Sequence, residues 1–69
     1  MNRVIRAVER KALELGYTVV EQTSRVVLAK RGFDGKFATW GFVIRSNKAE
    51  FFEGHYGMDF KSATEDFNQ

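Results

Sequence analysis

The sequence predicts an α+β fold in which a helix precedes a four-stranded antiparallel meander and a short helix follows it. Apolar residues recur at helical spacing near the start, residues 17–54 are rich in β-branched and aromatic residues separated by turn formers, and a capping pattern stands near the end. We expect a single domain over residues 1–69, because a chain this short has room for one modest core. We also expect two layers, with both helices on one face of the sheet.

The first helix is predicted over residues 3–15. Asn2 is a suitable N-cap, because its side chain can accept a hydrogen bond from a free amide of the first turn. Apolar residues recur at spacings of four and three, which places them on one side of the helix: Met1, Ile5, Val8, Ala12 and Leu15. Gly16 is expected to end the helix.

Four strands are predicted over residues 17–22, 25–31, 37–45 and 49–54. The turns between them are residues 22–24, 32–36 and 46–48, and the second turn contains Asp34-Gly35, a pair that suits a tight hairpin. Connections this short make neighbouring strands antiparallel.

The alternation of side chains predicts which face of the sheet the helices cover. We place Val26 and Leu28 under the helices, together with alternate residues of the third strand, Ala38, Trp40, Phe42 and Ile44. The opposite face is expected to be open and to mix small apolar residues with arginines, namely Arg25, Val27, Ala29, Arg31, Thr39, Val43 and Arg45.

A second, short helix is predicted near the end of the chain. Ser62-Ala63-Thr64-Glu65 matches a capping box, so we expect the helix to begin there. Phe60, Ala63 and Phe67 stand at spacings of three and four, which lets one side of this helix pack on the sheet.

The residues suited to catalysis are few. The chain has one histidine and no cysteine, so a zinc site is not expected, and we expect no cofactor. Glu53, His55 and Asp59 lie close together in sequence, and a carboxylate there could orient the imidazole as a general base. Because a lone histidine is more often structural, we read residues 55–57 as a strand end and loop, and we do not expect an enzyme.

Positive charge is concentrated before residue 49. Residues 1–48 contain ten Lys and Arg against four Asp and Glu, whereas residues 49–69 contain one Lys and five acids. Arg3, Arg6 and Arg10 follow one ridge of the predicted helix with Lys11 beside it, and guanidinium groups suit phosphate. Two interpretations stay open: a nucleic-acid-binding surface, or a solvated face whose cations pair with nearby Glu9 and Glu14.

Phe33 is the first candidate to anchor a protein partner. A large ring at the tip of a turn is hard to bury locally, although it could instead fold under the sheet edge. The candidate binding residues, for protein or nucleic acid, are Arg3, Arg6, Arg10, Lys11, Arg25, Arg31, Phe33 and Arg45. A homodimer through the open face or an edge strand is a further alternative.

No apolar run is long enough to cross a bilayer, and the start lacks the pattern of a secretory signal. We therefore expect a cytoplasmic protein without a membrane partner.

Two segments suggest a class of protein. Val-Glu-Arg-Lys-Ala-Leu-Glu-Leu-Gly-Tyr-Thr-Val-Val, residues 8–20, and Gly-His-Tyr-Gly-Met-Asp-Phe-Lys-Ser-Ala-Thr-Glu-Asp-Phe, residues 54–67, resemble the compact accessory proteins of phages and mobile elements. This resemblance implies a small interaction module that binds a host protein or complex and inhibits or redirects it, and it implies no catalytic residue. A protein partner is therefore preferred, and a nucleic acid held by the basic first helix is the alternative.

Overall fold

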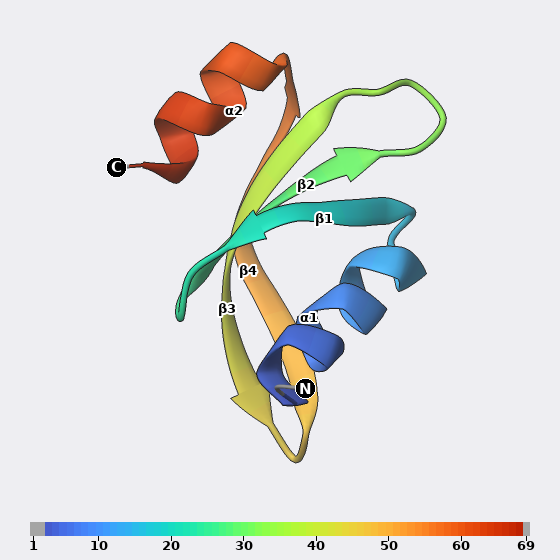
Figure 1. The fold of residues 1–69 in the computed structure, drawn as a ribbon, viewed down its shortest axis with the longest axis vertical. Coiled ribbons are helices and arrows are strands. Elements are labelled where there is room, and N and C mark those ends of the chain that lie inside the picture. The colour runs from blue at the N-terminus through green and yellow to red at the C-terminus, as the bar shows by residue number, and fades with distance from the viewer. Residues whose placement is uncertain (1–2, 69) are drawn as a thin grey trace.

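The computed structural model describes residues 3–68 and confirms the predicted α+β class and order of elements. The elements are α1 (Arg3–Glu14), β1 (Tyr17–Gln22), β2 (Val26–Arg31), β3 (Phe37–Arg45), β4 (Lys48–Met58) and α2 (Phe60–Phe67). The strands form one antiparallel sheet in the order β1-β2-β3-β4 (Figure 1). Asn2, the predicted N-cap, and Met1 lie outside the described residues. Between residues 3 and 68, neither helix has the length and apolar character that crossing a membrane requires.

Helix α1 packs on the sheet through small residues. Ala7, Val8 and Ala12 are its buried residues. Two members of the predicted apolar stripe lie at the margin, since Ile5 is 37% exposed and Leu15 is 45% exposed. The short side chains of the two alanines allow the helix backbone to approach the sheet closely.

Turn residues adopt positive φ angles at several of the predicted turns, but in the pair Asp34-Gly35 only Gly35 does so, and a longer turn over residues 32–36 replaces the tight hairpin predicted there. Gly16 follows α1 with φ +89°, and Gly35 lies in the β2–β3 turn with φ +71°. Ser46 and Asn47 join β3 to β4 with φ values of 50° and 64°, and two successive positive φ angles are typical of the tightest hairpins.

The two helices cover opposite faces of the sheet, so the prediction that both lie on one face is wrong. In the β2–β3 register, Ala29 pairs with Ala38 and Leu28 pairs with Thr39. Directly paired residues point to the same face. The even-numbered residues of β3 therefore share a face with the odd-numbered residues of β2. The prediction that Val26 and Leu28 share a face with Ala38 and Trp40 is wrong, because the register places them on opposite faces. Each face of the sheet carries one helix.

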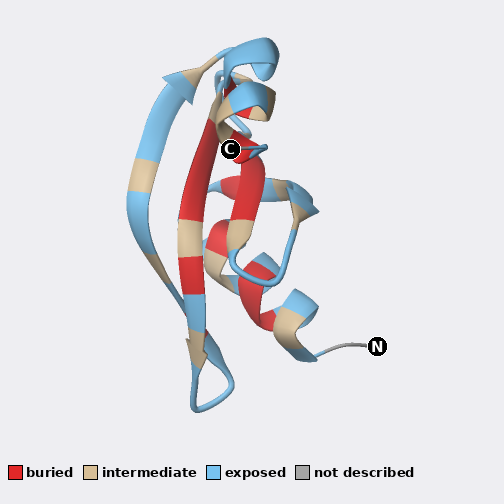
Figure 2. Cartoon of the chain, turned by 90° about the vertical axis from the view of Figure 1, so that its left-hand side faces the viewer, coloured by how far each residue is buried: buried red, intermediate tan, exposed pale blue. Residues whose placement is uncertain are grey.

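This arrangement divides the core into two clusters. The larger cluster lies under α1 and comprises Ala7, Val8, Ala12, Tyr17, Val27, Ala29, Ala38, Trp40, Phe42 and Ala49. The smaller cluster lies under α2 and comprises Leu28, Ala63 and Phe67, with Val26, Phe37 and Met58 packed against it. Figure 2 shows that burial is concentrated in the central strands and the inner side of α1, while the edge strand β4 is largely exposed.

Strand β4 is longer than predicted because two irregularities let it continue past residue 54. Its register with β3 shifts on both sides of the pair Thr39–His55, as expected where extra residues form bulges. Glu53 adopts φ 52° there, and Gly57 adopts φ 70°. The segment 55–57, predicted as a strand end and loop, is therefore part of the strand.

Helix α2 begins earlier than predicted. Asp59 is its N-cap, because its Oδ1 atom accepts a hydrogen bond from the Ser62 amide at 2.8 Å. The predicted capping box at Ser62 is therefore wrong, and Ser62 lies in the first turn as a donor. The ring of Phe60, at the first helical position, lies 5.3 Å from the ring of Phe37, which favours this earlier start.

We predict that Leu28→Ala lowers the free energy of unfolding by about 2–5 kcal/mol. Leu28 is 1% exposed and belongs to the cluster under α2, so its truncation should also weaken hydrogen-exchange protection in α2 more than in α1. Urea unfolding and hydrogen exchange measure both effects. Leu13→Ala is the control, since Leu13 is 67% exposed and should change stability by less than about 0.5 kcal/mol. Greater loss of protection in α1 than in α2 would contradict the placement of Leu28.

Candidate functional site: a basic groove beside the first helix

A surface rich in basic side chains lies between α1 and the β3–β4 hairpin. One hollow of about 160 Å³ is lined by Ala7, Arg10, Lys11, Glu14, Asn47, Lys48 and Ala49. A second hollow of about 260 Å³ is lined by Arg3, Arg6, Ala7, Arg10 and Asn47. Because the two hollows share Ala7, Arg10 and Asn47, they form one continuous depression, which we call the basic groove.

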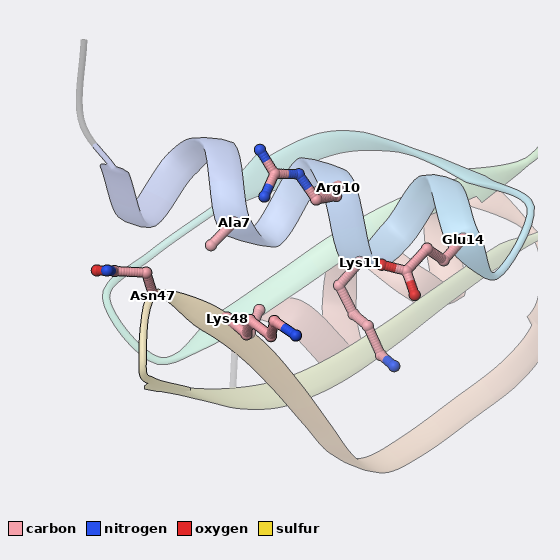
Figure 3. Close-up of a pocket in the computed structure, with 7 residues that line it drawn as sticks. Ala7, Arg10, Lys11, Glu14, Asn47 and Lys48 are labelled. Atoms are coloured by element: carbon pink, nitrogen blue, oxygen red, sulfur yellow. The ribbon is translucent and has the colours of Figure 1, made fainter.

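Two elements supply the two sides of the basic groove. Figure 3 shows Arg10 and Lys11 along the helix and Asn47 and Lys48 on the hairpin opposite. The positive φ angles of Ser46 and Asn47 turn the chain sharply, so that Lys48, the first residue of β4, stands beside α1. The floor includes Ala7, whose small side chain leaves the depression open.

Among the described residues, no carboxylate forms an ion pair with a cation of the basic groove. Within residues 3–68, no ion pair of 4.0 Å or less joins an acid to any of the five cations, Arg3, Arg6, Arg10, Lys11 and Lys48. The alternative that Glu9 and Glu14 neutralise the helix cations is therefore not seen in this structure. The first turn of α1 contains no acidic residue, so the positive end of the helix dipole adds to the charge of the arginines.

The structure brings together half of the predicted binding residues. Arg3, Arg6, Arg10 and Lys11 line the basic groove, whereas Arg25, Arg31, Phe33 and Arg45 lie elsewhere. Asn47 and Lys48 were missed by sequence reasoning, because no local pattern shows that the third turn packs beside the first helix.

The other predicted arginines differ in how they are engaged. Arg31 forms two hydrogen bonds with Asp34, at 3.0 and 2.7 Å, and these bonds lower the pKa of the Asp34 carboxyl to about 2. Arg45 lies 3.5 Å from Glu50, and both side chains are more than half exposed, so this pair contributes little to stability. Arg25 lines a separate hollow on the face that carries α2.

His55 has a structural partner that the sequence did not suggest. Its Nδ1 atom lies 2.8 Å from Oδ2 of Asp66 on α2, and the Thr39 hydroxyl donates to the same oxygen. These two interactions, first with Thr39 and then with His55, lower the pKa of the Asp66 carboxyl. Asp59, a predicted neighbour of His55, instead caps α2. The cluster therefore fastens α2 to β3 and β4, and residues 3–68 contain no group of three or more His, Cys, Asp or Glu that could hold a metal ion.

Comparison with family models, curated proteins and solved structures finds no match for this chain. The resemblance to phage accessory proteins and the preference for a host protein partner therefore stay predictions, and the geometry of the surface is the basis for assigning a function.

We predict that Asp66→Asn destabilises the protein near neutral pH and that this destabilisation shrinks as the pH is lowered. The pKa of Asp66 is below its usual value of 3.8 in the folded protein, so its contribution is complete above about pH 5 and is lost as the pH falls through the folded pKa. Losing a charged acceptor of two hydrogen bonds should cost about 1 kcal/mol, or about 4–8 °C in Tm. Thermal unfolding from pH 2 to pH 7 measures this, with Glu65→Gln as the matched control. A constant difference from wild type across this range would contradict the assignment.

Proposed function

We propose that this protein is a non-enzymatic binding module whose basic groove holds the phosphate backbone of a nucleic acid. The observation on which the proposal rests is the convergence of five cations on one continuous depression, without a carboxylate paired to any of them within residues 3–68. Arginine and lysine suit phosphate oxygens, and the release of counterions from a nucleic acid favours such binding.

The shape of the basic groove supports a polymer. Arg3 and Arg10 are seven residues apart in α1, so they span about 10 Å along the helix axis at 1.5 Å per residue. A row of cations of this length can contact more than one phosphate of a strand.

The lining of the basic groove favours a polyanion over a protein. Its apolar residues are the two alanines Ala7 and Ala49, and the residues that most often dominate protein interfaces include tryptophan and tyrosine. The other lining residues are charged or polar, with five cations against one acid, Glu14, which suits a backbone of phosphates.

The proposal of a non-enzymatic role is supported by the way the polar side chains around His55 are used. Asp66 is engaged by both His55 and Thr39, and Asp59 by the first turn of α2. Each of these groups therefore has a role in holding α2.

We predict that the protein binds a fluorescein-labelled DNA oligonucleotide and that the affinity falls by about a hundredfold between 50 and 200 mM salt, as expected for about four phosphate contacts. Arg10→Glu should weaken binding at least tenfold at 50 mM salt and reduce the slope of log K against log salt by about one or more, because Arg10 lines both hollows. Fluorescence anisotropy with single-stranded and duplex probes measures both quantities.

Lys36→Glu and Lys61→Glu are controls that make the same change of net charge at exposed positions outside the basic groove. They should weaken binding by less than threefold. Equal losses in all three variants would indicate general electrostatic attraction and would refute a groove-specific site, as would an absence of binding at 50 mM salt.

A further inference from the structure

The β2–β3 turn presents an exposed aromatic ring on a rigid support. Phe33 is 84% exposed, the largest value among the exposed large apolar residues in the described part of the chain. The guanidinium carbon of Arg31 lies 4.8 Å from the centre of its ring. Arg31 is in turn fixed by two hydrogen bonds from its side chain to Asp34 and a longer one, of 3.4 Å, to the Tyr17 hydroxyl. We call residues 30–36 the Phe33 tip.

The backbone of the Phe33 tip is also held in place. The Arg31 amide donates to the Lys36 carbonyl at 2.7 Å, and the Gly35 amide donates to the Arg31 carbonyl at 2.9 Å. The Lys36 amide donates to Oδ1 of Asp34 at 3.1 Å. A ring on so constrained a turn loses little conformational entropy when it docks, which is the property of an interface anchor.

A surface that can accept this ring lies on the sheet face that carries α2. A shallow hollow of about 430 Å³ is lined by Val26, Gly41 and Phe52, by Thr39 and Trp40, and by the polar residues Arg25, Glu53, His55 and Asp66. The Phe52 ring lies over Gly41, where a Cβ would come within 2.6 Å of it, and Phe52 is 45% exposed, so the apolar surface open to solvent is that of the Phe52 ring. We call this surface the open-face hollow.

The two surfaces have opposite charge. The Phe33 tip contains Lys30, Arg31 and Lys36 against one acid, Asp34, which gives a formal charge of +2. The open-face hollow is lined by Glu53 and Asp66 against Arg25, which gives a formal charge of −1 with His55 counted as neutral, and His55 lies 2.8 Å from Asp66. A hollow of about 510 Å³ beside Ile5 is lined by no charged residue, so it lacks this complementarity.

We propose that the Phe33 tip of one copy of this chain docks in the open-face hollow of a second copy. The donor and acceptor surfaces differ, so the contact is heterologous, and each bound copy keeps one free tip or one free hollow. Such contacts build rings or open chains rather than a closed dimer of identical surfaces. One phenylalanine buries about 150–250 Å² at most, so the association is weak and depends on protein concentration. This proposal does not depend on the basic groove.

Sedimentation equilibrium from about 10 μM to 1 mM tests the proposal, with mass expected to rise with concentration for the wild type. Phe33→Ala should remain monomeric over this range, whereas Leu13→Ala, which removes another exposed apolar side chain, should leave association unchanged. Phe52→Lys removes one wall of the hollow and adds a positive charge that opposes the basic tip, so it should also remain monomeric. Circular dichroism and thermal unfolding show whether each variant is folded, and Glu53→Lys, at an exposed position, is a second hollow variant.

Mixing the variants tests the heterologous geometry directly. Phe33→Ala keeps an intact hollow and Phe52→Lys keeps an intact tip, so the mixture should form a one-to-one complex and nothing larger, although neither variant associates alone. A monomeric wild type at 1 mM, unchanged association in Phe33→Ala, or no complex in the mixture would overturn the proposal.

Discussion

The structure depends on the packing of rings around Trp40 in the middle of β3. Trp40 is 3% exposed, and its ring lies 4.9 Å from Tyr17, 5.0 Å from Phe51 and 5.6 Å from Tyr56. Its indole Nε1 also donates to the Tyr56 hydroxyl at 2.9 Å. Tyr17 belongs to β1 and Tyr56 to β4, the two edges of the sheet, so one residue contacts both edges and the sheet must curl around it. Two features allow Tyr56 to reach the indole of Trp40. One is the pair of bulges in β4, and the other is the absence of a side chain at Gly54, where a Cβ would lie 2.6 Å from the indole nitrogen.

The packing of rings around Trp40 also supports α1, the helix that carries four of the five cations of the basic groove. Helix α1 rests on this cluster through Ala7, Val8 and Ala12, and aromatic side chains fill the core of a chain that has no cysteine for disulfides. Within residues 3–68, no ion pair of 4.0 Å or less engages the arginines of α1, and these arginines line a hollow with Asn47 of the β3–β4 hairpin. Arg31 differs, because its side chain is engaged by Asp34 and supports Phe33.

Local patterns in the sequence were sufficient for the elements but not for their mutual placement. Helical spacing and turn residues predicted α1, the three hairpins and the ridge of arginines. The alternation of side chains shows which residues of one strand share a face. The register between neighbouring strands decides which of their faces match, and alternation does not give this register. The sequence therefore groups Leu28 with Trp40, although the two residues lie on opposite faces of the sheet. The choice of Asp59 over Ser62 as N-cap depends on packing of Phe60 against Phe37, and the place of Lys48 depends on how the last hairpin meets α1. These are contacts between residues distant in sequence, which local chemistry does not determine.

The packing of one indole against both edges of the sheet is tested by nuclear Overhauser contacts of the chain's single tryptophan. This packing predicts cross-peaks from the Trp40 ring protons to the rings of both Tyr17 and Tyr56, together with slow solvent exchange of the Nε1 proton. Cross-peaks to only one of these tyrosines, or rapid exchange of the indole proton in the folded protein, would contradict it.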